Sequence, residues 1–419
     1  MFPAPPRILV LTSTFPRWHG DTEPPFVFEL CRRLTDCFDI HIVAPHANGA
    51  LREADVDGMR VTRYRYFLSQ WETLAYRGGI LANLKQNRFR YGLIPFFLLF
   101  QVLAIRKLLW QYSFDLIHAH WLIPQGVCAV LARRMLGING PSILCTSHGG
   151  DLYGLNGRPF TWLKRRTVKS SSAVTVVSQA MRMELSSLGG AMEKVHVVPM
   201  GVDLQNRFVP PRSRNSTKSL LFIGRVVEKK GLRYVIEAMP EILAQHPGAT
   251  LRVAGDGQEL GHAKNLADNL GVGGSIEFLG AVGNAFLPGL CKASAVVVFP
   301  SIIAEGGDRE GFGLVLVEAL GCECAVVSTD LPATRDIIKD GETGLVVAQK
   351  DARQLADRVN QLFSDPGLRA RLGANGRRHV LQRFDWSIIS NQYKTLIQSV
   401  LNDDQARHPF LYNRNKRQQ

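Results

Sequence analysis

Residues 220–232 read LLFIGRVVEKKGL, and this short stretch contains the unit from which most of the chain is built. The four apolar residues from Leu220 to Ile223 are typical of a buried strand. Gly224 and Arg225 follow as a turn, and we expect a helix to begin near Leu232. A strand, a turn and a helix in this order are typical of a parallel sheet covered by helices.

The same alternation recurs on both sides of a polar, proline-bearing segment, NRFVPPRSRNSTKS at residues 206–219. It predicts an α/β protein with two Rossmann-like, doubly wound domains. The predicted strands are Ile8 to Leu11, Ile40 to Val43, Leu116 to Ala119, Ile143 to Thr146, Val174 to Val177, Val195 to Val198, Leu220 to Ile223, Leu251 to Ala254, Ile276 to Leu279, Ala295 to Phe299, Ala325 to Ser328 and Gly344 to Val347.

A chain of 419 residues exceeds what one hydrophobic core usually supports, which also favours two domains. We place the first domain at residues 1–205, the linker at 206–219 and the second domain at 220–383. A last helix at 384–405 and a basic tail at 406–419 complete the chain.

The formal net charge is +14, and the first half is the more basic. Residues 1–203 hold 23 Lys and Arg against 14 Asp and Glu, and residues 204–419 hold 27 against 22. This positive charge would attract nucleic acid, an anionic membrane surface or a phosphate-bearing substrate. Because the sequence has no nucleic-acid-binding motif, we expect no nucleic-acid partner.

The densest apolar run, Leu93 to Ile105, allows two interpretations. It is shorter than the roughly 20 residues that span a bilayer, and basic residues flank it on both sides. One interpretation is a helix buried on the first sheet, which we favour. The other is a helix lying in the interface of an anionic membrane.

Seven irregularly spaced cysteines favour buried thiols in a reducing compartment over a disulfide framework. The first residues lack the pattern of a signal peptide. The sequence therefore predicts a cytoplasmic location, with the inner face of the membrane as an open alternative.

Two stretches carry residues suited to an anionic, hydroxyl-rich ligand. The first is Gly224-Arg225 with Lys230, where cations follow a strand and precede a helix, an arrangement that suits a diphosphate. The second runs from Glu310 to Glu318. Its glycines leave backbone N–H groups accessible at a helix start, and its two carboxylates, eight residues apart, can address one helix face. The residues whose backbone N–H groups would face the ligand are Gly311, Phe312, Gly313 and Leu314.

The stretch from Glu310 to Glu318 resembles the E-x7-E motif of the retaining GT-B glycosyltransferases, in particular glycosyltransferase family 4. Other stretches match the family in the same order and cover most of the chain. They are Asp115 to His120, Ser147 to Asp151, Val198 to Asp203, Gly224-Arg225 with Lys230-Gly231, and Asp340 to Val346. The resemblance implies the GT-B fold, in which two domains face each other across a cleft.

The resemblance also implies a role for individual residues. Arg225 and Lys230 would bind the donor's diphosphate, Glu318 the nucleotide ribose, and Glu310 the transferred sugar. His148 matches the family's active-site histidine. Asp151 and Gly20 would lie on the acceptor side.

The implied activity is retaining, metal-independent transfer of a sugar, a hexose by expectation, from a nucleotide-diphosphate sugar to an acceptor. We expect the acceptor to be a lipid-linked glycan in surface polysaccharide or glycolipid biosynthesis. Neither a cofactor nor a metal is expected. The alternative is a non-catalytic carbohydrate-binding or scaffold protein of the same fold. The base, the sugar and the acceptor stay open, in part because Met200 and the segment 331–336 depart from the family pattern.

Four local patterns suggest other chemistry. Asp55-Val-Asp57 and His118-x-His120 could bind a metal, but neither has further ligands in the sequence nearby. We expect the two histidines to share one face of a strand. His148-Gly-Gly resembles an esterase oxyanion loop without its nucleophile motif, and residues 255–261 narrowly miss the dinucleotide fingerprint.

Overall fold

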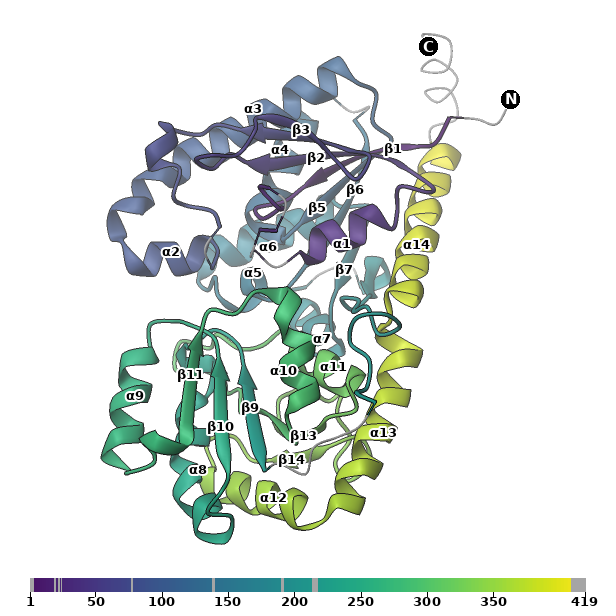
Figure 1. The fold of residues 1–419 in the computed structure, drawn as a ribbon. Helices are drawn as coiled ribbons and strands as arrows, with labels where there is room; N and C mark the ends of the chain where they lie inside the picture. The colour runs from purple at the N-terminus through teal and green to yellow at the C-terminus, as the bar shows by residue number, and fades with distance from the viewer. Residues whose placement is uncertain are drawn as a thin grey trace. The chain divides into compact units, whose positions relative to one another are not determined.

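The chain forms two compact units, each built around a parallel sheet (Figure 1). The computed structural model describes residues 4–18, 20–21, 23, 25–76, 78–137, 140–189, 192–212 and 218–407. Residues 213–217 of the predicted linker and 408–419 of the predicted tail lie outside the described residues. The first unit contains the chain up to Val177, Met181–Val198 and the chain from Ser390; the second contains Ser178–Ala180 and Pro199–Ile389. The division after Val198 falls ahead of the predicted linker.

The sheet of the first unit has eight strands in the order β3-β4-β2-β1-β5-β6-β7-β8. Neighbouring strands are parallel except β3 and β4. All six strands predicted for this half are present. The bounds are β1 (Arg7–Leu11), β2 (Asp39–Pro45), β3 (Glu53–Val56), β4 (Met59–Tyr64), β5 (Leu116–His120), β6 (Ser142–Ser147), β7 (Ala173–Val176) and β8 (Val195–Val197).

The hairpin of β3 and β4 was not predicted. Asp57 and Gly58 form its two-residue turn, with φ angles of 50° and 77°. An Asp-Gly pair between two short strands is a recognised hairpin signal, because both turn residues need a positive φ. The Asp55 carboxylate accepts a hydrogen bond from the Gly58 N–H at 3.0 Å. Asp55 therefore closes a turn, which accounts for the Asp-x-Asp pattern without a metal.

Helices cover this sheet, and the apolar run at 93–105 belongs to one of them. The helix α3 (Ile94–Gln111) follows the 3-10 segment η2 (Arg88–Leu93) and packs on α4 (Val127–Arg134). The favoured interpretation, a helix buried on the first sheet, holds for one face of α3 only, since another face is exposed. The remaining helices here are α1 (Phe26–Arg32), α2 (Ile80–Gln86), α5 (Gly150–Tyr153), α6 (Arg158–Ser170) and α7 (Gln179–Ser187).

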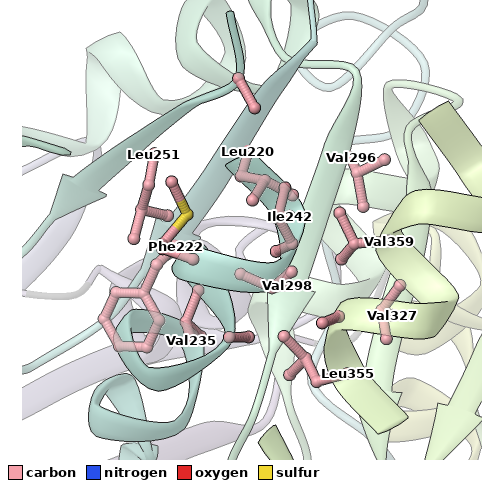
Figure 2. Close-up of a cluster of buried hydrophobic side chains, with 14 of the residues drawn as sticks. Leu220, Phe222, Val235, Ile242, Leu251, Val296, Val298, Val327, Leu355 and Val359 are labelled. Carbon is pink, nitrogen blue, oxygen red and sulfur yellow. The ribbon is translucent and has the colours of Figure 1, made fainter. Parts of the chain in front are cut away.

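The sheet of the second unit has six parallel strands in the order β11-β10-β9-β12-β13-β14. Its side chains form a core with those of α8 (Leu232–Gln245) and α12 (Ala352–Ser364), which Figure 2 shows. All six strands predicted for this half are present. The strands are β9 (Ser219–Ile223), β10 (Thr250–Ala254), β11 (Ile276–Gly280), β12 (Val296–Phe299), β13 (Ala325–Thr329) and β14 (Leu345–Val347). The other helices are α9 (Leu260–Asn269), α10 (Leu287–Ala293), α11 (Leu314–Gly321), α13 (Pro366–Phe384) and α14 (Trp386–Arg407).

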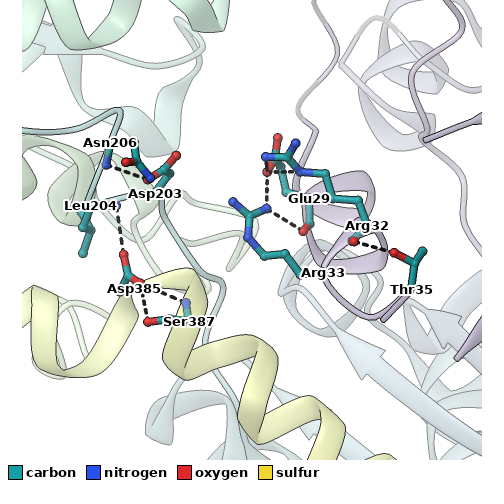
Figure 3. Close-up of polar contacts among 9 residues, drawn as sticks. All are labelled: Glu29, Arg32, Arg33, Thr35, Asp203, Leu204, Asn206, Asp385 and Ser387. Carbon is teal, nitrogen blue, oxygen red and sulfur yellow. Dashed lines mark hydrogen bonds and ion pairs between the residues drawn. The ribbon is translucent and has the colours of Figure 1, made fainter. Parts of the chain in front are cut away.

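A bridge between distant segments marks the junction of α13 and α14. The Val202 N–H donates to the Phe384 carbonyl at 2.9 Å, and the Trp386 N–H donates to the Val202 carbonyl at 3.1 Å. Asp385, between the two helices, accepts from the Leu204 N–H at 3.1 Å (Figure 3). The junction lies where the sequence predicted that the last helix begins.

Polar contacts also tie parts of the first unit together. Figure 3 shows Glu29 of α1 accepting from Arg32 and Arg33, one turn further along the chain. From Ser390 onward α14 belongs to the first unit, where the Tyr393 hydroxyl lies 3.4 Å from the Thr175 hydroxyl of β7. The first unit is therefore assembled from both ends of the chain.

Replacement of Gly201 tests the packing at the junction. A Cβ atom at this position would overlap the buried ring of Trp386, whereas a Cβ at Gly248 would meet nothing within 4 Å. We expect Gly201→Ala to destabilise the second unit by about 1–3 kcal/mol, the usual cost of overpacking. Gly248→Ala is the control and should change stability far less. Calorimetric unfolding of both variants measures the difference in stability. Equal unfolding temperatures for the two variants would contradict the close packing of Gly201 on Trp386.

Candidate active site

The loop after β9 places cations at the carboxyl end of the second sheet. Gly224 ends the strand with a φ of 151°, and the exposed Arg225 follows it. Gly255, after β10, approaches so closely that a Cβ there would overlap the Gly224 carbonyl oxygen. The glycines at 255 and 257 thus serve close contact between two strand-end loops, and not a dinucleotide fingerprint.

Two consecutive lysines hold Glu310 in this loop region. The Lys230 ammonium lies 3.2 Å from one Glu310 carboxylate oxygen, and that of Lys229 lies 3.9 Å from the other. Lys229 also binds Asp308 at 3.0 Å. The side chains of Lys230 and Glu310 are each only 13% exposed, so water screens their attraction weakly. The structure therefore brings together the residues predicted for the diphosphate and for the sugar.

The charges of this cluster stabilise one another. Burial by itself would raise the pKa of Glu310, but Lys230, Lys229 and Arg225 outweigh it and hold this pKa below its usual value. Burial lowers the pKa of Lys230, and the nearby cations Lys229 and Arg225 act in the same direction, while Glu310 opposes them. Glu310 is therefore an anion at neutral pH, and Lys230 depends on it for much of its stabilisation as a cation.

The start of α11 presents unpaired backbone donors. Gly313 precedes the helix with a φ of 110°, a conformation that favours glycine. Among the described residues, the N–H groups of Gly311 to Leu314 have no hydrogen-bond acceptor. The Gly311 carbonyl instead accepts from the Ser178 hydroxyl at 2.8 Å, which fixes this loop. The side chain of Phe312 is buried, so only its backbone can meet a ligand.

Glu318 lies on α11, further along the helix. It is half-buried, and no hydrogen-bond or ion-pair partner is found for its carboxylate within the described part of the chain. Burial raises its pKa to about 7, although Arg207 and Lys230 act in the opposite direction. A carboxylate without partners at a site rich in donors is suited to accept hydroxyl groups from a ligand.

His148 lies in the first unit, at the end of β6, within a cluster of rings. Its Nε2 lies 3.0 Å from the Nδ1 of His120, and the two imidazoles are stacked at 5.2 Å. His118 and His120 share one strand face, as predicted, with ring centroids 4.3 Å apart. The rings of Phe26 and Trp121 also pack on His148, with centroid distances of 4.8 and 5.1 Å.

Burial keeps this histidine cluster neutral. It lowers the pKa of His118 and of His148 to about 3, and neighbouring imidazoles lower that of His120 further. His148 therefore acts as a neutral hydrogen-bonding group at physiological pH. Among the described residues, no group of three or more His, Cys, Asp or Glu side chains is arranged to hold a metal ion.

Asp151, predicted on the acceptor side, is buried in the first unit beside His148. One oxygen of its side chain accepts from the Ser147 hydroxyl at 2.9 Å and the other from the Leu122 N–H at 2.6 Å. Burial raises its pKa, and these two hydrogen bonds oppose the rise. Asp151 thus supports the loop beside His148 through two internal hydrogen bonds.

Gly20 lies in an exposed loop that an ion pair closes. Its φ of 78° favours glycine, although a Cβ there would meet nothing within 4 Å. Arg17 forms two side-chain hydrogen bonds with Asp21, at 2.7 and 2.8 Å, and its guanidinium lies over the rings of Trp18 and Tyr76. The sequence analysis missed Arg17 and Asp21 as the residues that shape this loop; their i, i+4 spacing is the signal that was available.

The fold of the chain is shared with solved structures of other proteins. Solved structures of similar fold include sucrose-phosphate synthase from Thermosynechococcus elongatus, with a TM-score of 0.77, 21% identity and coverage of 95% of this chain and 100% of that one. HepE from Anabaena in complex with UDP-glucose has a TM-score of 0.70, 19% identity and coverage of 94% and 99%. The chain has the GT-B fold.

Sequence comparison then gives the family. Residues 25–206 match the model of glycosyltransferase family 4, and residues 205–379 match that of glycosyl transferases group 1. Phosphatidyl-myo-inositol mannosyltransferase from Mycobacterium tuberculosis is 30% identical over 309 residues, 71% of this chain and 76% of that protein. The chain belongs to this family of glycosyltransferases, and it is a transferase enzyme.

Replacement of Glu318 tests its environment through the dependence of stability on pH. The folded state favours the protonated carboxyl up to a pKa of about 7, against 4.5 for an unperturbed Glu. The unfavourable ionisation is therefore absent below about pH 4.5 and complete above about pH 7. We expect Glu318→Gln to raise stability by about 3 kcal/mol at pH 8, because one pKa unit corresponds to about 1.4 kcal/mol.

The same variant should differ little from the unaltered chain at pH 4.5. Thermal unfolding at both pH values, without ligand, measures the difference. A stabilisation that is equal at both values would show that ionisation is not its cause.

Proposed function

We propose that the enzyme transfers a hexosyl group from a nucleoside-diphosphate sugar with retention of configuration and without a metal. The observation that carries this proposal is the ion pair of Lys230 and Glu310 beside the unpaired N–H groups at the start of α11. Cations suit the diphosphate, and donors with a fixed carboxylate suit the sugar hydroxyls.

In the proposed reaction the bond between the anomeric carbon and the phosphate oxygen breaks, and its electron pair stays on the leaving diphosphate. Arg225 and Lys230 stabilise the negative charge that develops there, which is the task that a metal performs in other transferases. The acceptor oxygen attacks from the face that the leaving group departs from. The hydroxyl proton of the acceptor passes to a phosphate oxygen of the leaving group.

In this proposal the remaining site residues bind and orient the nucleotide sugar. Glu310 accepts hydrogen bonds from hydroxyls of the transferred sugar, and Glu318 accepts those of the ribose. Because His148 is neutral, its contribution is a hydrogen bond to the sugar and not a positive charge. The contact with His120 holds its imidazole ring in one orientation.

We propose a lipid-linked glycan or glycolipid as the acceptor. In support, the relative from Mycobacterium tuberculosis has phosphatidyl-myo-inositol in its name. The proposed location is the cytoplasm, at the inner face of the membrane. Seven cysteines, all described and none in a disulfide, suit a reducing compartment.

The alternative of a non-catalytic sugar-binding protein does not hold, because the chain is a transferase enzyme. Such a binding protein would need the hydroxyl-binding carboxylates but not a pair of ammonium groups concentrated where a diphosphate leaves. The presence of both Lys229 and Lys230 around Glu310 therefore favours transfer.

Turnover in the presence of chelator tests the proposed chemistry. Nucleotide release from a panel of nucleotide sugars, measured with excess EDTA, should continue at the rate found without it. NMR of the glycoside product should show the anomeric configuration of the donor. Loss of turnover with EDTA and recovery with manganese would refute metal independence, and an inverted product would refute retention.

Replacement of Lys230 tests the assignment of the leaving group. Lys230→Met removes the ammonium while keeping an unbranched side chain, so we expect turnover to fall at least about 10-fold. Arg233→Met is a matched control, because Arg233 is 72% exposed on α8 and, within the described part of the chain, forms an ion pair only with Glu237. Steady-state turnover rates of both variants measure the effect of losing the Lys230 ammonium. An unchanged rate in Lys230→Met would remove the diphosphate assignment.

A further inference from the structure

The outer face of α3 exposes large apolar side chains at helical spacing. Phe96, Leu99, Phe100, Leu103 and Trp110 are between 40% and 82% exposed. They recur at intervals of three, four and seven residues, so that they line one side of the helix. Soluble monomers rarely leave so many large apolar residues together on one element.

Residues outside α3 extend this surface. The Phe67 ring lies 5.4 Å from that of Phe96, so the segment after β4 is continuous with the helix. Leu68 and Trp71 in that segment are 61% and 56% exposed. In η2, directly before α3, Phe89 is 94% exposed. We call the outer face of α3 with Phe67–Trp71 and Phe89 the α3 surface.

The opposite face of α3 is part of the first unit's core. Phe97, Val102, Ile105 and Leu108 are buried, and the helix packs on α4 and near β2 and β4. Figure 1 shows α3 running along the edge of the first unit beside α4. The segment Arg88–Gln111 is long and apolar enough to cross a membrane by composition alone. Because one face is committed to its own domain, α3 is positioned to lie along an apolar phase and not to cross it.

The charged residues in the sequence around α3 have one sign. Residues 73–114 contain six Lys and Arg and no Asp or Glu. Of these, Arg88, Arg106 and Lys107 are exposed next to the apolar side chains. Trp71 and Tyr91 near the start of α3 and Trp110 near its end are residue types that favour the boundary between lipid and water.

We propose that the α3 surface docks the enzyme on an anionic lipid bilayer, with the apolar side chains among the acyl chains and the cations on head groups. This inference does not rest on the proposed sugar chemistry. A second copy of the chain is a less suitable occupant, because two α3 surfaces would bring the same cations together.

Vesicle flotation of the full chain tests the proposal. The enzyme should float with vesicles of phosphatidylcholine and phosphatidylglycerol at low salt, and much less with phosphatidylcholine alone. The double variant Leu99→Glu, Leu103→Glu should lower the partition coefficient at least about 10-fold, since charged groups would replace the inserted side chains. Leu270→Glu in the second unit is the matched control, because Leu270 is 40% exposed and Leu103 is 41% exposed.

The basic residues are tested separately. Arg106→Gln with Lys107→Gln should weaken binding to the anionic vesicles about 25-fold, from about fivefold for each cation near a charged surface. Binding to neutral vesicles should change little. Thermal unfolding of every variant, measured without ligand, checks that the protein is folded and separates this test from the proposed reaction.

Three results would overturn the proposal. The first is a lack of flotation with anionic vesicles. The second is resistance of the bound enzyme to alkaline carbonate, which would indicate a spanning helix. The third is a dimer in light scattering that the Leu99→Glu, Leu103→Glu variant converts to a monomer, which would make the α3 surface an interface between copies.

Discussion

The ion pair between Lys230 and Glu310 is the interaction on which the second unit's site depends. The two residues follow different strands, β9 and β12, which are neighbours in the sheet. Their charges meet at 3.2 Å in a weakly hydrated position, so each stabilises the charged form of the other. Removal of either would leave a poorly solvated charge, which is more costly than loss of a surface ion pair. The pair also connects the loop after β9 with the segment that leads into α11.

The two units differ in the charge state of their buried ionisable groups. In the second unit, Glu310 is kept charged by three cations close to it. In the first, burial without a carboxylate partner keeps His118, His120 and His148 uncharged. The physical reason is the same in both units, since low local polarity amplifies whatever charge lies nearby. Charged groups are therefore concentrated at the strand ends of the second sheet, and neutral imidazoles at the ends of β5 and β6 in the first.

The predictable part of the fold was its parallel strands. A strand buried on both faces is a short apolar run between turns, and the runs beginning at Ile8 and Leu220 both proved to be strands. The cluster of Lys230 with Glu310 was also predictable, because the carboxyl ends of parallel strands meet at one edge of the sheet. The expected roles of Glu310 and Glu318 came from the resemblance of this stretch to a known motif.

Other features depended on contacts that local sequence does not encode. The burial of Asp151 was not predicted, because one of its partners is the backbone N–H of Leu122, far away in sequence. The exposed side of α3 was not predictable, since a helix that is apolar on all sides has no periodicity to show which face is covered. The hairpin at Asp57-Gly58, by contrast, carried a readable signal.

The contact of Tyr393 with Thr175 has a consequence for how the protein is made. A chain emerges from the ribosome with its first residues leading, so the first sheet is synthesised long before the segment from Ser390 that completes this unit. The second unit is finished earlier, because all its residues precede Ser390. No single cut of the chain can therefore release an intact first unit, and a shortened version of it must carry the closing helix as a separate or grafted segment.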